Sequence, residues 1–288
     1  MTIAAGFKFH GGTLLCADTE ITHGWELKSV GSKILPVDFA SNGGSKAVFT
    51  FSGAVHYAKM AIQQCTRTLA ACDSTCMGRQ RMVGLIAEEL HKFHIKHIYK
   101  HPLYMRSGGP DFNLIFAVWS QHEGVGLYET SDEAVIEITN QDIYALMGSG
   151  AVLAKYVVTL LVRHPFLKLE DIATAATHML AEVKRWVPGC GGHSELLALR
   201  DNGEMSNVAG FDVSHVVEFG EQFHSSFWGL FLEACDPSTP DQQISERFDG
   251  FRRVVNGMRE HRKQELEDPR PEMRKLIKVL SERKTQKM

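Results

Sequence analysis

The order of apolar patterns along the chain restricts its fold more than any single motif does. Strand signals crowd residues 2–52, and a second strand group begins at residue 112. Each group is followed by two segments with helical spacing, and short strands end the pattern. The expected helices cover residues 55–71, 78–100, 150–164 and 169–186, and the later expected strands cover residues 112–119, 125–128, 134–138, 144–147, 195–199 and 206–209. This order predicts an α+β fold of four layers, αββα, in which two antiparallel sheets pack between helix pairs.

The domain organisation follows from length and composition. The chain has 288 residues and 44% hydrophobic side chains, which is enough for one well-buried domain with an appendage. We expect a domain over residues 1–220 and a charged helical extension over residues 221–288. The extension begins with a stretch rich in Phe and Leu, and Pro237 and Pro240 then interrupt it.

The end of the extension is basic. Residues 241–288 contain 13 basic and 9 acidic side chains, a net charge of +4, against −7 for the remainder of the chain. We expect helical pieces that are interrupted at Pro269 and Pro271. A basic tail of this kind can contact a neighbouring subunit, bind nucleic acid or remain a solvated helical appendage.

Charge, apolar runs and cysteines limit the cellular setting. The net charge of −3 argues against nucleic-acid binding driven by bulk charge. No apolar run approaches the roughly 20 residues that span a bilayer, and the N-terminus lacks the pattern of a signal peptide. Six cysteines in a chain of this length do not form a disulfide scaffold. We therefore expect a cytoplasmic protein with free thiols, no cofactor, and neither nucleic acid nor membrane as a partner.

Thr2 directly follows Met1 and precedes the first apolar run. We expect removal of Met1, since a small residue follows it, and Thr2 would then have its hydroxyl and a free α-amine on one residue. A threonine hydroxyl needs an adjacent proton acceptor in order to attack a carbonyl. An α-amine titrates at about 7.7–8.0, so that it can serve as this acceptor.

A series of glycine turns and polar residues follows Thr2 at characteristic places. They are the turn His10-Gly11-Gly12, the strand end at Asp18, the segment from Gly31 to Pro36 with Lys33, the strand-to-helix junction at Gly53, Gly148-Ser149-Gly150 before a helix, and Gly189-Cys190-Gly191-Gly192 before a late strand. This ordered set resembles the proteasome-type N-terminal nucleophile hydrolases, including proteasome β subunits and bacterial proteasome-like proteins. The resemblance covers residues 2–218 and implies the same four-layer sandwich.

The resemblance also implies a role for individual residues. Thr2 would be the nucleophile with its amine as base, and Asp18 would pair with Lys33, whose ammonium assists proton transfer. The Gly53 N–H would stabilise the oxyanion, and Ser149 would form a hydrogen bond near the terminal amine. The substrate peptide would lie along the backbone of Thr22, and the substrate side chain before the cut bond would enter an apolar pocket of limited depth. The pocket would be lined by Phe51 and Val55.

One stretch departs from the family pattern. The family has an aspartate three residues before a serine that precedes Gly-Gly, whereas this chain has Val187 and Cys190 at these positions. A valine cannot accept a hydrogen bond or balance the charge of an amine. The departure leaves open whether the chain is catalytic or a non-catalytic assembly subunit.

Four histidines share one face of the second expected helix. They are His91, His94, His97 and His101. Pairs at this spacing can ligate a metal, but no carboxylate pattern accompanies them and lysines lie between them. A polar helix face is the favoured interpretation, and we expect no metal site.

These observations favour a threonine-type endopeptidase that cleaves peptides or unfolded proteins and that self-associates into a ring or a stack. A structural or assembly subunit on the same fold is the alternative, and a metal-binding protein is a weaker third reading. Substrate preference, oligomer geometry and a partner ATPase have no signature in the sequence.

Overall fold

The chain divides into two compact units, residues 1–216 and 217–288. The computed structural model describes residues 2–23, 27–39, 44–72, 78–104, 110–139, 142–162, 167–208 and 213–267. The first unit contains two large antiparallel sheets and a short two-stranded ribbon. The described residues of the second unit are helical, apart from the turn that joins the two helices.

The first sheet has the strand order β10-β1-β2-β11-β12. Its strands are β10 (Tyr144–Met147), β1 (Ala4–Phe9), β2 (Gly12–Asp18), β11 (Ser194–Arg200) and β12 (Met205–Asn207). The second sheet has the order β5-β6-β7-β8-β9. Its strands are β5 (Ile34–Phe39), β6 (Ser45–Gly53), β7 (Phe112–Ser120), β8 (Gly124–Ser131) and β9 (Ala134–Glu137), and the ribbon pairs β3 (Glu20–His23) with β4 (Leu27–Val30).

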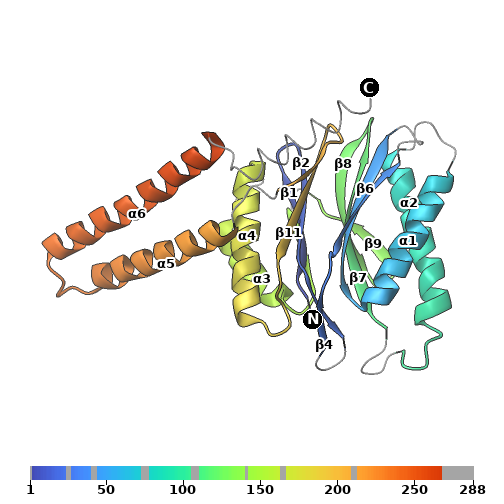
Figure 1. Cartoon of the computed structure of the whole chain (residues 1–288), viewed down its shortest axis with the longest axis horizontal. Helices are drawn as coiled ribbons and strands as arrows, with labels where there is room; N and C mark the ends of the chain where they lie inside the picture. The colour runs from blue at the N-terminus through green and yellow to red at the C-terminus, as the bar shows by residue number, and fades with distance from the viewer. Residues whose placement is uncertain are drawn as a thin grey trace, which may run out of the picture. The chain divides into compact units, whose positions relative to one another are not determined.

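Helix pairs cover the outer faces of the two sheets (Figure 1). The pair α1 (Val55–Ala71) and α2 (Arg79–Phe93) packs on the second sheet, and the pair α3 (Ala151–Leu161) and α4 (Leu169–Trp186) packs on the first. A third apolar layer lies between the sheets. The predicted α+β fold with four αββα layers is thereby confirmed.

Alternation along the strands divides the side chains between these layers. On β11, Leu196 and Ala198 face the helices, whereas Leu197 and Leu199 face the second sheet. A period of two is what a strand imposes, because successive side chains point to opposite faces of the sheet. Both faces of each sheet are therefore buried, which explains why the inner strands are apolar almost throughout.

The ends of α4 show why this segment is helical. Glu170 and Asp171 lie in its first turn, and Lys184 and Arg185 lie in its last turn, so that both pairs complement the helix dipole. The Asp171 carboxylate accepts a hydrogen bond of 3.2 Å from the Lys168 backbone N–H, which satisfies one of the unpaired donors at the helix start.

The second predicted helix changes its winding near its end. The α-helix stops at Phe93, and His94–Ile98 form a π-helical turn. The His94 ring is buried there, stacks on the Phe112 ring at 5.2 Å and lies 2.8 Å from the Leu90 carbonyl oxygen through Nδ1. Packing of this histidine against β7 is a tertiary effect, which helical periodicity alone does not predict.

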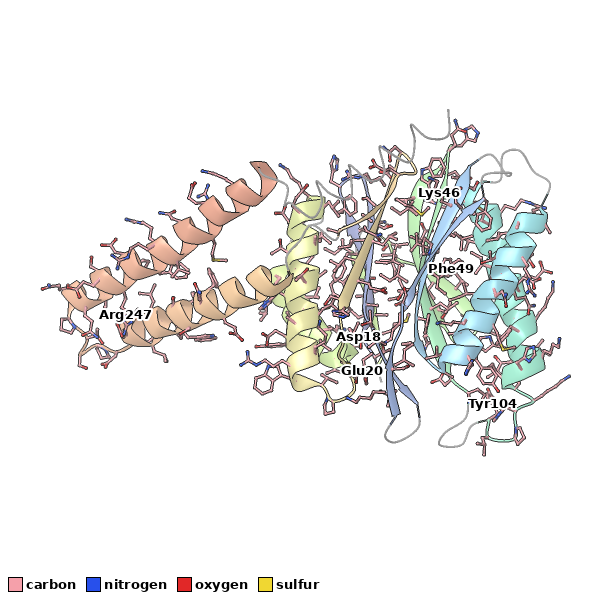
Figure 2. All side chains as sticks on the ribbon, viewed as in Figure 1. Asp18, Glu20, Lys46, Phe49, Tyr104 and Arg247 are labelled. Carbon is pink, nitrogen blue, oxygen red and sulfur yellow. The ribbon has the colours of Figure 1, made fainter. Side chains whose placement is uncertain are left out.

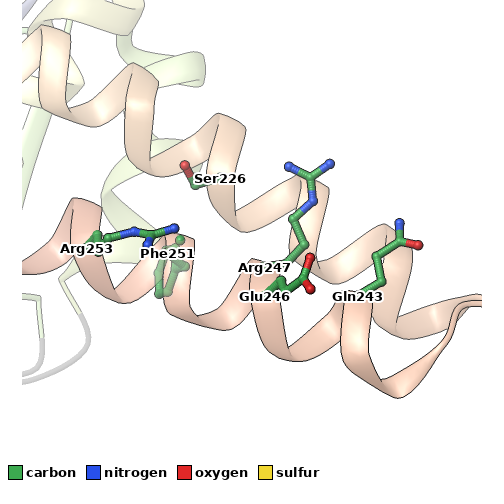
Figure 3. Close-up of a pocket in the computed structure, with 7 residues that line it drawn as sticks. Ser226, Gln243, Glu246, Arg247, Phe251 and Arg253 are labelled. Atoms are coloured by element: carbon green, nitrogen blue, oxygen red, sulfur yellow. The ribbon is translucent and has the colours of Figure 1, made fainter.

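The described residues 213–267 form a pair of helices. Helix α5 (Val213–Cys235) begins before the expected start of the extension at residue 221 and runs across it, and α6 (Asp241–Glu267) follows the turn that contains Pro237 and Pro240. The expected interruptions at Pro269 and Pro271 lie outside the described residues. Arg247 of α6 binds the Glu233 carboxylate of α5 at 2.9 Å, beside a groove between the two helices (Figure 3).

Candidate active site

Strand pairing brings Thr2 to Asp18. Strand β1 pairs antiparallel with β2, with Ala4 opposite Ala17, so that Ile3 lies opposite Asp18 at the end of β2 and Thr2 comes directly before it. The Thr2 hydroxyl donates a hydrogen bond of 2.6 Å to Asp18 Oδ1, and the Ile3 N–H donates one of 3.0 Å to the same oxygen. Thr2 is 5% exposed and Asp18 is fully buried.

Lys33 completes this contact from the other sheet. It directly precedes β5, and its side chain is almost fully buried. Its Nζ donates to Asp18 Oδ1 at 2.7 Å and also to the Thr2 hydroxyl oxygen. Burial lowers the pKa of the Lys33 amine, against the opposing attraction of the Asp18 carboxylate. At a given pH the amine is therefore neutral more often than an ordinary lysine, and a neutral amine can accept a proton.

The buried carboxylate of Asp18 has donors on both oxygens. In addition to Thr2, Ile3 and Lys33, the Gly191 N–H donates to Asp18 Oδ2 at 3.0 Å. Figure 2 shows Asp18 at the end of β2, close to Glu20 at the start of β3. A buried charge is tolerated when it is paired and hydrogen bonded in this manner. Asp18 thus ties the start of β1, the start of β5 and the glycine turn before β11 to one point.

The turn between β10 and α3 holds the backbone of Thr2. The Thr2 N–H donates to Ser149 Oγ at 3.2 Å, and the Gly150 N–H donates to the Thr2 carbonyl oxygen at 3.2 Å. Gly148 has a φ of +94°, and a Cβ at this residue would lie 2.3 Å from the Thr2 carbonyl oxygen. Glycine is required here because only glycine adopts this conformation at such a close approach.

Val187 and Cys190 stand where the resemblance to proteasome-type hydrolases implies an aspartate and a serine. Val187 follows the last residue of α4 and packs against the core between that helix and the first sheet. Cys190 Sγ lies 3.8 Å from Ser149 Oγ, and burial raises the pKa of the Cys190 thiol. The thiol therefore remains protonated at neutral pH, and it is only a weak donor or acceptor.

A small pocket opens beside Thr2 and collects the substrate-binding candidates. The residues that line it are Thr2, Glu20, Ile21, Thr22, Lys33, Phe51, Ser52, Gly53 and Val55. Phe51 is 1% exposed and limits the depth of the pocket. Six of the eight residues that the sequence singled out line the pocket, and the other two, Asp18 and Ser149, contact Thr2 directly.

Gly53 ends β6 at the junction with α1. Its φ is +89°, and a Cβ would lie 2.2 Å from the Asp111 carbonyl oxygen. The Ala54 N–H already donates to this carbonyl at 2.7 Å. The close approach of the chain at Asp111 thus gives a steric reason for glycine, and it keeps Gly53 at the rim of the Thr2 pocket.

Three charged residues near the site escaped the sequence reasoning. Glu20 lines the pocket and forms an ion pair of 2.8 Å with Lys28. Glu195 Oε2 accepts hydrogen bonds from the loop that precedes β5. Lys184 Nζ donates to Ser194 Oγ at 2.8 Å, and burial lowers the pKa of its amine. Of these three, only Glu195 could have been found from the sequence. It alternates in step with Leu197 and Leu199 along its strand, so that its side chain faces the layer between the sheets.

The side chains of the four histidines in the α2 region contact other residues of the chain. His91 pairs with Glu133 at 2.7 Å, the His97 ring packs on Phe93 at 4.7 Å, and the His101 Nδ1 accepts the Leu103 N–H. Among the described residues, no group of three or more His, Cys, Asp and Glu side chains is arranged to hold a metal ion.

The cysteines and the helices of the described part of the chain have two further properties. Cys16, Cys65, Cys72, Cys190 and Cys235 have free thiols. Of the helices in the described ranges, none has both the length and the apolar character to cross a bilayer.

Comparison with solved structures relates this fold to Anbu. The helical assembly of the Anbu complex from Pseudomonas aeruginosa has a TM-score of 0.67 and 14% identity, and covers 84% of this chain and 99% of that chain. Anbu, an ancestral beta-subunit, from Yersinia bercovieri has a TM-score of 0.66 and 14% identity, and covers 83% and 100%. An Anbu Gly-1 mutant from Hyphomicrobium sp. strain MC1 has a TM-score of 0.65 and 15% identity, and covers 79% and 96%.

No protein-family model and no curated protein matches the sequence. At 14–15% identity the similarity shows the fold alone, a proteasome-like fold.

Proposed function

We propose that the protein is a threonine-type peptidase subunit that uses Thr2 as its nucleophile. One observation carries the proposal: Asp18 and Lys33 both contact the Thr2 hydroxyl in a buried site. A hydroxyl in hydrogen-bond contact with a lysine that burial pushes towards its neutral form has the environment that activates a nucleophile. In this proposal residues 1–220 form the hydrolase domain and residues 221–288 form an appended assembly element.

In the first step the neutral Lys33 amine accepts the proton of the Thr2 hydroxyl while Oγ attacks the carbonyl carbon of the scissile peptide. The resulting oxyanion is stabilised by the Gly53 N–H. Collapse of the tetrahedral intermediate expels the amine product, which takes the proton from Lys33, and leaves an ester on Thr2. Water then hydrolyses the ester and regenerates the hydroxyl.

The α-amine of Thr2 has a different place in this scheme from the one that the family resemblance implies. Thr2 N lies against Ser149 Oγ, whereas Lys33 Nζ lies against the reacting oxygen. The hydroxyl donates to Asp18 and accepts from Lys33, and once the Lys33 amine is neutral this second contact can reverse, so that Lys33 accepts the hydroxyl proton. We assign the amine, once the preceding residue is removed, to the activation of the hydrolytic water.

The pocket beside Thr2 favours a small or medium apolar side chain next to the scissile bond. Ile21, Phe51 and Val55 give it apolar walls, and the fully buried Phe51 ring fills its depth. Large aromatic side chains would have to displace this ring. The substrates would be peptides or unfolded proteins, because the chain around the scissile bond has to be extended to lie along the Thr22 backbone.

A non-catalytic assembly subunit on the same fold is the second candidate. Val187 supports it, since no carboxylate stands at that position to balance the charge of a terminal amine. The intact mass of the protein isolated from its natural source, with a fluorogenic peptide assay on the same sample, separates the two. A chain that begins at Thr2 and cleaves peptides supports the peptidase. A chain that retains the preceding residue and cleaves none supports the assembly subunit.

Self-association is the second part of the proposal. Phe227, Trp228, Phe231 and Leu232 on α5 are 41–65% exposed, and large exposed apolar patches usually mark interfaces. A helical assembly is described for the Anbu complex of Pseudomonas aeruginosa. We expect a homo-oligomer larger than a dimer that weakens when residues 221–288 are deleted. Light scattering decides this: a monodisperse full-length monomer, or an oligomer unaffected by the deletion, contradicts it.

A further inference from the structure

Glu195 connects the first sheet to the loop that leads into Lys33. Its Oε2 accepts a hydrogen bond of 3.2 Å from the Lys33 backbone N–H and one of 2.9 Å from the Ser32 hydroxyl. Glu195 belongs to β11 of the first sheet, while Lys33 directly precedes β5 of the second sheet. One carboxylate oxygen therefore joins the two sheets at the residue that contacts the Thr2 hydroxyl.

The place of Glu195 on its strand is unusual for an acidic residue. Its partner in β2 is Ala17, and Ala17, Leu197 and Leu199 all belong to the apolar layer between the sheets. Glu195 shares this face by alternation. A carboxylate directed towards that layer needs hydrogen-bond donors. The loop before β5 supplies these donors, the Ser32 hydroxyl and the Lys33 backbone N–H, neither of which is used in strand pairing.

The loop before β5 also forms a backbone hydrogen bond with the residue that follows Asp18. The Gly31 N–H donates to the Thr19 carbonyl oxygen at 3.0 Å. Glu195 acts two residues later, directly at Lys33. The Lys33 side chain is long and flexible, and its Nζ has to meet both Asp18 and Thr2, so the position of its backbone decides whether it reaches them. Misplacement by about 1 Å can lower a rate by about 10²-fold.

We propose that Glu195 is a positioning residue that sets the location of Lys33 relative to Thr2 through its hydrogen bonds to the loop before β5. The proposal deepens the proposed function, on which its kinetic part rests. In this chain Glu195 provides a further carboxylate near the site, and it acts on Lys33 rather than on the terminal amine. Glu195 itself touches neither substrate nor the reacting atoms.

The test compares three variants in the full-length chain. Glu195→Ala removes the acceptor, Glu195→Gln keeps an acceptor without the charge, and Glu204→Ala removes an exposed carboxylate that pairs with Arg200 at the end of the same strand. We expect Glu195→Ala to lower kcat by about 10- to 100-fold with KM changed by less than about twofold. Glu195→Gln and the Glu204→Ala control should stay within about threefold of the wild type. If Glu195→Ala does not fold, Glu195→Asp replaces it, since the shorter side chain cannot reach both donors.

A second readout does not depend on activity. The Lys33 amine is titrated by NMR of ¹³Cε-labelled lysine in each variant, with Lys33→Arg to assign the signal. Loss of positioning lets water reach the amine, which raises the Lys33 pKa towards the ordinary lysine value of about 10.4 in Glu195→Ala alone. Loss of a nearby negative charge would instead lower it in both Glu195 variants.

These two readouts separate the possible failures. The proposal is overturned if Glu195→Ala leaves both kcat and the Lys33 titration unchanged, or if Glu195→Gln changes them as much as Glu195→Ala does. A wild-type protein that cleaves no peptide contradicts the proposed function, and the Lys33 titration then decides the positioning role by itself.

Discussion

The two sides of Thr2 differ in the groups that they present to it. The hydroxyl side has the buried pair of Asp18 and Lys33, which both form hydrogen bonds with the Thr2 hydroxyl. The backbone nitrogen side has the Ser149 hydroxyl at 3.2 Å and, behind it, the Cys190 thiol. The first side is ionic and closely connected, while the second is neutral and loosely connected.

This difference indicates where the chain can move protons. A buried carboxylate and a lysine with a lowered pKa can exchange and stabilise charge at the hydroxyl. A hydroxyl and a protonated thiol can only orient a neighbouring group. We therefore place the activation of the nucleophile on the hydroxyl side, where it does not depend on a carboxylate at residue 187.

Removal of the nucleophile should have the largest effect. Thr2→Ala is expected to abolish peptide cleavage, because no other described hydroxyl contacts both Asp18 and Lys33. The fold should persist, since Asp18 keeps the Ile3, Lys33 and Gly191 donors. Fluorogenic peptide hydrolysis and circular dichroism measure the two effects. Equal turnover by the wild type and Thr2→Ala contradicts the assignment, and Thr2→Ser is the control that keeps a hydroxyl.

Removal of Lys33 comes next. Lys33→Ala should reduce kcat by more than tenfold and within the range of about 10²–10⁴ that positioned proton transfer provides. Lys184 offers a matched control, because it is another lysine that is partly buried near Asp18 but that donates to Gly192 and Ser194. Lys184→Ala is expected to lose less than about tenfold. If Lys33→Ala turns over peptides at the wild-type rate, the ionic side of the site is structural.

The pH dependence should reveal Lys33 directly. Since burial lowers its pKa, the neutral amine forms below the ordinary lysine value of about 10.4, and kcat should rise with pH through this lowered pKa. Between the lowered pKa of Lys33 in the folded protein and its ordinary value in the unfolded chain, the unfolded chain binds more protons. The free energy of unfolding therefore also rises with pH in this range, and this contribution is lost as the pH falls through the folded pKa. Rate profiles and urea unfolding at several pH values measure both. A rise that persists in Lys33→Arg, whose guanidinium stays protonated, assigns it to another group.

Changes on the nitrogen side should have the smallest effect. Cys190→Ser exchanges the thiol for the hydroxyl that the family has at this position, beside Ser149. Because neither group carries charge, kcat should change by less than about threefold. Steady-state kinetics of this variant tests the comparison itself: a gain or a loss of tenfold or more would show that the side chain at residue 190 contributes to the reaction.

The sequence predicted the layers well because their cause is local. Alternation in the strands and helical spacing over residues 55–71 and 169–186 are properties of neighbouring residues, and the helices α1 and α4 have these bounds. The glycines at residues 53 and 148 were also recognised from the sequence, and both adopt positive φ values. These features recur at the same places in the structure for reasons of backbone sterics.

The support around the site could not be predicted in this way. The contacts of Glu195 with Ser32 and of Lys184 with Ser194 depend on how β11 and α4 lie beside distant loops. The π-helical turn at His94 depends on packing against Phe112 of β7. Each of these contacts joins residues that are far apart in the sequence. No local sequence pattern indicates such a contact, and only the folded structure brings the residues together.

The most direct test of the central claim is the site of acylation by a peptide β-lactone, whose strained ring acylates an activated hydroxyl. The full-length protein is incubated with this reagent and analysed by intact and tandem mass spectrometry. We expect one acyl group on Thr2, none on Thr2→Ala, and much slower labelling of Lys33→Ala. A protein that remains unmodified, or that carries the acyl group on Ser149 or Cys190, would contradict the account.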